Sequence, residues 1–181
     1  MIEWSKIARR IRVPLGFAFA VFYLWVAHPS WSSILFGTVI AIPGIALRAF
    51  ASGHVKKNEE LTISGPYAYT RNPLYLGSLI MALGFAVAAR SVWVLVVMVA
   101  MFLVIYLPVI RSEEAYLRAK FPAFDDYARN VPRLIPHPRR YSNQAGAFSA
   151  PLYWQHREYN AVLGTVALMA ALVAKLMWGS R

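Results

Sequence analysis

The sequence contains no cysteine, and it has only 8 acidic residues against 19 Lys and Arg. The absence of cysteine excludes a disulfide framework, thiol catalysis, a cysteine-ligated zinc site and an iron–sulfur centre. There is also no P-loop, no G-x-G-x-x-G pattern and no internal repeat. The chemistry of the chain must therefore rest on residues outside these common motifs.

Apolar residues, in contrast, are abundant. They make up 59% of the chain, and the mean hydropathy of +0.46 exceeds that of ordinary soluble domains. A hydrocarbon core of about 30 Å requires an apolar helix of about 20 residues. We predict one all-α domain over residues 1–181, a polytopic membrane helical bundle. Its expected transmembrane segments are about 13–27, 31–53, 73–89, 91–110 and 160–178.

The first of these segments has a competing interpretation. It is short and follows the basic stretch KIARRIR, as the apolar part of a cleaved signal peptide would. The following WVAHPS is a poor small-residue cleavage site. A retained membrane anchor is therefore favoured.

The third and fourth segments are separated by little more than Arg90 and Ser91. So short a connection predicts a tight helical hairpin. The start of the third helix and the end of the fourth are then expected at the same membrane surface.

Basic residues indicate the orientation. They gather at the N-terminus, in the loop 54–72 and in the segment 111–159, whereas the opposite side keeps only Arg90 and Arg181. By the positive-inside rule, the three basic regions face the cytoplasm. The N-terminus and the two catalytic segments 54–72 and 111–159 are thus predicted to be cytoplasmic, with the C-terminus on the opposite side. Because topology explains the basic excess, no nucleic-acid partner is predicted.

Two charged residues, Arg48 and Lys175, fall inside predicted spans. Charge in hydrocarbon is costly, and long side chains avoid the cost by extending to the headgroups. We therefore expect both to reach toward the nearer membrane surface.

The stretch SGPYAYTRNPLYLG, residues 64–77, is the most specific in the chain. Asn72 followed by Pro73 is typical of a helix N-cap and first helical residue. A helix N-terminus attracts anionic groups, and Arg71 adds a positive charge beside it. Aromatic faces for a purine or a cation come from Tyr67, Tyr69 and Tyr75. The alternative is an interfacial tyrosine belt with a capped helix start.

A second polar group follows the fourth segment, in RSEEAYLRAKF. Arg111, Glu113 and Glu114 are expected at the cytoplasmic level of the helix start at residue 73. Their carboxylates could bind ribose hydroxyls or offset a positive ligand. The alternative is a solvated helix end with a Glu114 to Arg118 pair.

These motifs resemble the isoprenylcysteine carboxyl methyltransferase and phospholipid methyltransferase superfamily of integral membrane enzymes. The family signature is Arg-His-Pro-x-Tyr, a hydrophobic span and Glu-Glu, and the similarity extends over about residues 48–136. Asn72 stands where the motif has histidine, and asparagine does not titrate. The matching residues are Arg71, Pro73, Tyr75, Glu113 and Glu114.

The resemblance implies a methyltransferase that uses S-adenosylmethionine and acts on a lipophilic acceptor in the membrane. The acceptor would be an isoprenylcysteine-type carboxylate or a lipid headgroup. The segment 131–136 would cap the cofactor. The residues assigned to cofactor binding are Leu61, Tyr67, Asn72, Pro73, Leu74, Tyr75, Glu113 and Glu114.

No histidine lies in the matched motif, which favours an acceptor that is already deprotonated. Such an acceptor needs charge neutralisation rather than a general base. We therefore assign Arg71 and Arg111 to the acceptor. If an ammonium acceptor must lose a proton, a glutamate, here assigned to Glu114, or a lipid phosphate would have to take it. Substituting the two arginines in turn tests this hypothesis through acceptor affinity and turnover.

Two other functions remain open. Sterol or steroid-type membrane reductases resemble the same family but use NADPH, and they tend to read Arg-His-Pro-Asn-Tyr where this chain has Leu74. A non-enzymatic membrane module is the second. Binding of S-adenosylmethionine, of NADPH or of neither would separate the three.

The histidines show no metal-ligand spacing, so no metal site is predicted. We expect them to be polar surface residues. They are His28, His54, His137 and His156.

Overall fold

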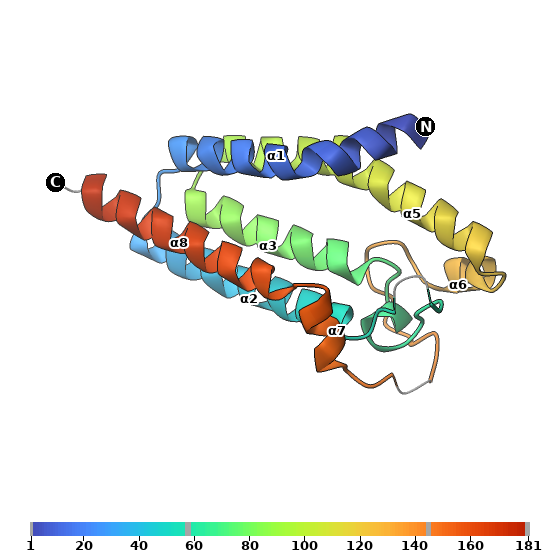
Figure 1. The fold of residues 1–181 in the computed structure, drawn as a ribbon. Helices are drawn as coiled ribbons and strands as arrows, with labels where there is room; N and C mark the ends of the chain where they lie inside the picture. Colours follow the sequence, from blue (N-terminus) through green and yellow to red (C-terminus); the bar gives the residue numbers. More distant parts are fainter. Residues whose placement is uncertain (1, 57–58, 144–145, 180–181) are drawn as a thin grey trace. The chain divides into compact units, whose positions relative to one another are not determined.

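The computed structural model describes residues 2–56, 59–143 and 146–179, and the side chains of all of these except 2–13 and 179. All regular elements in these residues are helical, so the predicted all-α class is confirmed (Figure 1). In chain order they are α1 (Ile2–Val26), α2 (Trp31–Ser52), the 3-10 turn η1 (Gly65–Ala68), α3 (Pro73–Ala89), α4 (Val92–Met101), the π-helical η2 (Phe102–Tyr106), α5 (Leu107–Lys120), α6 (Phe124–Asn130), α7 (Ala150–Gln155) and α8 (Tyr159–Gly179).

Three helical stretches are long and apolar enough to cross a membrane. They are Trp31–Ser52, the continuous stretch Val92–Lys120 and Tyr159–Trp178. The apolar parts of α1 and α3, Pro14–Val26 and Pro73–Ala89, are shorter. A helix therefore lies at each of the five predicted segments, and whether α1 and α3 cross the bilayer stays a prediction.

The first helix begins earlier than expected, at Ile2 rather than near residue 13. The basic N-terminal stretch is therefore helical. Lys57 and Arg181, which contributed to the orientation argument, lie outside the described residues. The cytoplasmic placement of the N-terminus and of the catalytic segments stays a prediction.

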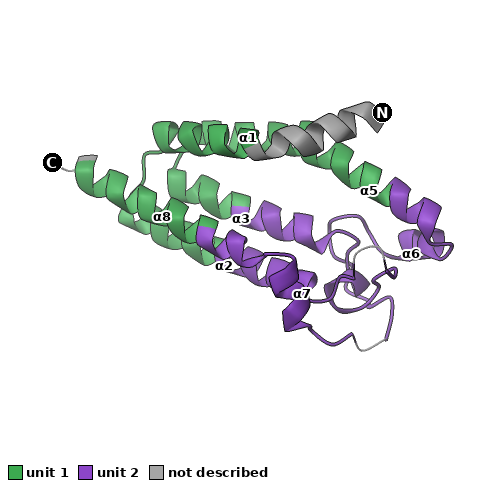
Figure 2. Cartoon of the chain, in the orientation of Figure 1, with its two compact units in different colours: residues 1–41, 82–114, 164–181 green, residues 42–81, 115–163 purple. Residues whose placement is uncertain are grey.

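The chain forms two compact units, shown in different colours in Figure 2. The first unit contains residues 1–41, 82–114 and 164–181, and the second contains residues 42–81 and 115–163. Helices α2, α3, α5 and α8 each contribute residues to both.

The first unit is organised around an apolar core. Tyr23, Ala88, Val94 and Leu172 are among its fully buried members. Side chains also donate hydrogen bonds to helix carbonyls in this unit, for example from Tyr23 Oη to Phe85 O at 2.9 Å. Burial of the apolar core members is a non-directional contribution to the stability of this unit.

Close backbone contact in this unit depends on two glycines. A Cβ at Gly84 would lie 2.5 Å from Gly37 O, and a Cβ at Gly37 would lie 2.5 Å from Gly84 O. Small residues let membrane helices approach in this way. The Nζ of Lys175 donates to the carbonyl oxygens of Leu24 and Trp25, near the end of α1. Its expected reach toward the membrane surface stays a prediction.

In the second unit, the same two helices approach through another pair of glycines. A Cβ at Gly44 would lie 2.6 Å from Gly77 O, and one at Gly77 would lie 2.7 Å from both Gly44 O and Arg48 Cγ. The start of α3 is thereby held close to the C-terminal half of α2.

Candidate functional site

The turn before the site is built around a buried histidine. Gly65 has a φ of +57°, in the left-handed region that favours glycine. A Cβ there would lie 2.5 Å from His54 Cδ2, so space also requires glycine. The η1 turn follows, and its residues Pro66, Tyr67 and Ala68 are buried.

Each residue from 67 to 72 forms a hydrogen bond to the segment 127–141. This row of bonds joins two loops that are about sixty residues apart in the chain. With the donor first, the bonds are Tyr127 Oη to Tyr67 O at 2.8 Å, Tyr141 N to Ala68 O at 3.0 Å, His137 N to Tyr69 O at 2.9 Å, Thr70 Oγ1 to Leu134 O at 3.0 Å, Arg71 N to Pro132 O at 2.9 Å and Asn72 Nδ2 to Arg133 O at 3.1 Å. We call this row the loop zipper.

The loop zipper leads directly into helix α3. The helix begins at Pro73, as the sequence predicted, and its first backbone bond runs from Leu76 N to Asn72 O at 3.0 Å. Proline lacks an N–H, so it occupies the first helical position without losing a bond. Asn72 is only 9% exposed and Pro73 is fully buried, whereas Arg71 and Tyr75 are half-buried.

An apolar cluster supports the loop zipper from one side. It consists of Phe124, Tyr127 and Val131, which are each at most 2% exposed. Leu61, predicted to contact the cofactor, packs against this cluster. Its assignment to the cofactor stays a prediction.

Tyr141 connects the same region to α6. Its Oη donates to Asp126 Oδ2 at 2.7 Å. This hydrogen bond raises the pKa of Tyr141, with smaller contributions from burial and from the negative charge of Asp126. The Tyr141 phenol is therefore neutral well into the alkaline range.

The second predicted group lies on α5. Arg111 and Glu113 are exposed, whereas Glu114 is only 6% exposed. Arg118 pairs with Asp125 at 2.7 Å, and the alternative of a Glu114 to Arg118 pair stays a prediction. Residues 111–114 belong to the first unit and the start of α3 to the second, and the predicted meeting of the two groups stays a prediction.

The expectation that all histidines lie at the surface is wrong for His54. Its side chain is buried, with Nδ1 at 2.8 Å from Phe50 O and Nε2 at 3.1 Å from Gly146 O. The neighbouring ring of Phe148 comes from the same distant segment as Gly146. No local pattern signals this burial, because Gly146 and Phe148 are about ninety residues away in the chain.

Possible metal ligands do not cluster in the described part of the chain. There, no group of three or more His, Cys, Asp or Glu side chains is arranged to hold a metal ion. His137 has Nδ1 accepting from Arg139 N at 3.1 Å, and His156 has Nδ1 at 3.0 Å from Ser52 O.

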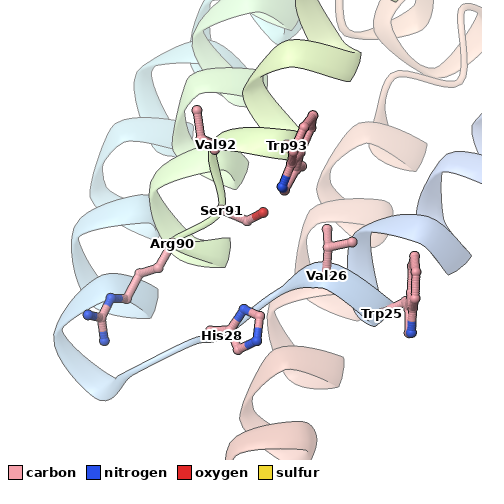
Figure 3. Close-up of a pocket in the computed structure, with 7 residues that line it drawn as sticks. All are labelled: Trp25, Val26, His28, Arg90, Ser91, Val92 and Trp93. Atoms are coloured by element: carbon pink, nitrogen blue, oxygen red, sulfur yellow. The ribbon is translucent and has the colours of Figure 1, made fainter.

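A cavity of about 490 Å³ lies in the first unit, and no predicted site residue is among its lining residues (Figure 3). It is formed where α1 meets α2 and α3 meets α4, near His28 and Arg90. Its remaining lining residues are Trp25, Val26, Ser91, Val92 and Trp93.

Comparison with known families identifies the segment that carries these features. Residues 38–123 match the phospholipid methyltransferase family. That family belongs to the isoprenylcysteine carboxyl methyltransferase-like superfamily, so the resemblance predicted from the sequence is confirmed. The matched segment contains Arg48, the start of α3 and the pair Glu113 and Glu114.

Two curated proteins are similar to parts of the chain. The cobalt-zinc-cadmium resistance protein CzcN of Cupriavidus metallidurans is 37% identical over 90 residues, which are 50% of this chain and 42% of that protein. The nickel-cobalt-cadmium resistance protein NccN of Alcaligenes xylosoxydans xylosoxydans is 32% identical over 113 residues, which are 62% of this chain and 52% of that protein. The chain thus matches about half the length of these relatives. No solved structure matches it significantly.

Proposed function

We propose that the chain transfers a methyl group from S-adenosylmethionine to a lipophilic acceptor in the membrane. The observation that carries this proposal is the loop zipper, which holds the family motif from Arg71 to Tyr75 at the start of an apolar helix. A water-soluble cofactor and a membrane-dissolved acceptor can meet only at such an interface. Helices that are long and apolar enough to span a membrane agree with this setting.

The residues at the start of α3 fit the chemistry of S-adenosylmethionine. The amides of the first helical turn, together with the Arg71 cation, suit the carboxylate of the cofactor. Tyr75, half-buried beside them, offers an aromatic face to the adenine or the sulfonium. Glu114, a carboxyl only 6% exposed, suits the ribose hydroxyls.

The protein would contribute positioning and exclusion of water. Asn72, donating to Arg133 O, holds the segment 131–136 against the motif, where we assign it the capping role. Pro73 fixes the first helical residue, so the amides that follow have a defined direction. Tyr67 is 8% exposed, and its backbone carbonyl accepts a hydrogen bond from Tyr127 Oη. Burial and this bond would hold the ring of Tyr67 in place.

When bound, the cofactor supplies an electrophilic methyl group, whose bond to sulfur breaks as an acceptor lone pair forms the new bond and a neutral thioether remains. A carboxylate acceptor carries that lone pair without losing a proton. The role left for the chain is to neutralise the acceptor's charge, which we assign to Arg71 and Arg111. Glu114 would take the proton if the acceptor is an ammonium headgroup.

Calorimetry on the detergent-purified full chain tests cofactor identity. S-adenosylhomocysteine is titrated into the wild type and into Asn72→Ala and Glu114→Gln, with NADPH titrated in parallel. We expect micromolar binding of the thioether, weaker in both variants and unchanged in the exposed variant Arg118→Gln. Binding of NADPH instead would favour the reductase, and binding of neither would favour a non-enzymatic module.

Acceptor class is tested separately by methyl transfer to two substrates. A prenylated cysteine presents a carboxylate, and vesicles of phosphatidylethanolamine present an ammonium. For a carboxylate acceptor, Arg71→Gln and Arg111→Gln should each raise the acceptor KM. Unchanged KM and turnover in both variants would reject their assignment to the acceptor.

A further inference from the structure

We propose that Arg48 is a positioning residue that aims the first turn of α3, with Glu158 holding its guanidinium in place. The proposal rests on the proposed function, because that turn carries the motif assigned to S-adenosylmethionine. Neither Arg48 nor Glu158 belongs to the predicted site. The sequence predicted only that Arg48 reaches toward the nearer membrane surface, which stays a prediction, and it did not indicate the partners described below.

All three guanidinium nitrogens of Arg48 are used within the second unit. Nε donates to Glu158 Oε2 at 3.0 Å, and one terminal nitrogen donates to both Glu158 oxygens at 2.8 Å. The other terminal nitrogen donates to Leu74 O at 3.3 Å and to Ser78 Oγ at 2.5 Å. The bidentate pair fixes the guanidinium plane, so the remaining nitrogen faces α3.

Packing of α2 on α3 brings Arg48 to this position. A Cβ at Gly77 would meet Arg48 Cγ at 2.7 Å, so the arginine stem lies directly over the glycine. Any larger residue at 77 would occupy the path of the stem. The glycine contact and the guanidinium contacts therefore act on neighbouring turns of α3.

The partner carboxylate is brought in by an unusual backbone turn. Arg157, just before Glu158, has a φ of +54°, in the left-handed region that non-glycine residues seldom adopt. Such strain persists where surrounding contacts determine the conformation. The turn separates α7 from α8 and places Glu158 on Arg48, with the two side chains only 11% and 23% exposed.

Stability alone is a weak explanation for this arrangement. Removing two charges from water offsets much of their attraction, and apolar replacements of buried ion pairs are often neutral. A fixed hydrogen-bond direction is what an apolar pair cannot supply. Here the hydrogen bond from Arg48 is accepted by Leu74 O. Leu74 lies in the same helical turn as the amides that we assign to the carboxylate of the cofactor.

The experiment compares two double variants of the full chain in lipid nanodiscs. Arg48→Met with Glu158→Gln removes the Arg48 contacts without leaving a lone buried charge. Arg118→Met with Asp125→Asn removes an exposed ion pair of the same unit. We expect S-adenosylhomocysteine affinity to fall about tenfold in the first, the size expected when a hydrogen bond to a charged group is lost, and to stay unchanged in the second. The unfolding temperature should change little in either.

Conservative variants sharpen the result. Arg48→Lys keeps the positive charge and one donor nitrogen, and it should retain part of the affinity for S-adenosylhomocysteine. Ser78→Ala removes one acceptor on α3 while leaving the ion pair, and should cause a smaller loss. Affinity that is unchanged in the Arg48 double variant, or that falls only together with the unfolding temperature, would overturn the proposal.

A second readout does not depend on the cofactor. The chain has no cysteine, so spin labels at Ala46→Cys in α2 and Tyr69→Cys before α3 report one distance without background. Both positions are exposed. The distance distribution should broaden in the Arg48 double variant and not in the control. If the wild type binds no S-adenosylhomocysteine, the proposed function fails, and an unchanged distribution would then overturn the positioning role on its own.

Discussion

The two units of this protein use different interactions at equivalent helix contacts. Gly37 and Gly84 in the first unit, and Gly44 and Gly77 in the second, each let α2 and α3 touch through their backbones. In the first unit, the neighbours of this contact are small apolar residues such as Ala41 and Ala88. In the second, the neighbours are Met81 and Arg48, and Arg48 carries an ion pair.

This difference indicates a division of roles. Burial and close packing are non-directional, so they hold a helix pair together without aiming any particular group. Hydrogen bonds and bidentate ion pairs have direction. The second unit concentrates them in the loop zipper and around Arg48, where the motif of the phospholipid methyltransferase family begins α3.

The largest effect is expected from filling a glycine contact. In Gly84→Ala the new Cβ would lie 2.5 Å from Gly37 O and 2.9 Å from Ala41 N. Both are backbone atoms, so no side-chain rotation can relieve the contact. We expect a loss of about 2 to 3 kcal/mol in the free energy of unfolding, the upper range for overpacking. Chemical denaturation in mixed micelles measures it.

The matched control is Gly164→Ala, since no atom lies within 4 Å of its Cβ position. This change should be neutral or stabilising, because alanine favours a helix. Equal destabilisation by the two changes would mean that close contact is not what distinguishes Gly84.

A smaller effect is expected from the loop zipper. Tyr127→Phe removes the hydroxyl that donates to Tyr67 O at 2.8 Å and leaves that buried carbonyl with one bond fewer. The expected loss is about 1 to 2 kcal/mol. Tyr116→Phe is the control, because that ring is 49% exposed and its hydroxyl contacts Lys120.

Thermal unfolding followed by circular dichroism compares these two tyrosine variants. S-adenosylhomocysteine affinity should fall in Tyr127→Phe only. An equal response of both variants would show that the loop zipper has no special role in holding the motif.

A still smaller effect is expected from the exposed ion pair. The side chains of Arg118 and Asp125 are each 56% exposed, so solvent screens their attraction. A double-mutant cycle with Arg118→Met and Asp125→Asn should give a coupling below about 1 kcal/mol. The same cycle on Arg48 and Glu158 should give a larger coupling, and the reverse order would contradict the contrast between buried and exposed pairs.

The smallest effect is a pH dependence confined to the alkaline range. The pKa of Tyr141 is raised above its ordinary value of 10.0 by its hydrogen bond to Asp126. A raised folded-state pKa stabilises the fold below the unfolded value of 10, and this contribution is lost as pH rises through the folded value.

Tyr141→Phe should therefore remove a component of stability that disappears only above about pH 10. Denaturation at pH 8 and at pH 11 measures it, with Tyr116→Phe as control. A difference between wild type and Tyr141→Phe that grows with pH would contradict the assigned hydrogen bond.

Much of the fold was predictable because its signals are local. Apolar length placed a helix at each of the five expected segments, and Asn72 followed by Pro73 placed the start of α3. The family was predictable for the same reason, since its motif is a short run of residues. The early start of α1 was not, because its first turns are basic rather than apolar.

By itself, the sequence determined the helical class, the apolar spans, the start of α3 and the match of residues 38–123 to the phospholipid methyltransferase family, since each is encoded in neighbouring residues. Only the tertiary structure decided that His54 is buried, that 67–72 bonds to 127–141, and that Arg48 pairs with Glu158. These contacts join residues about 60 to 110 positions apart. The sequence alone does not show whether a polar side chain faces water or binds a distant partner, because burial and hydrogen-bond direction exist only once the chain has folded.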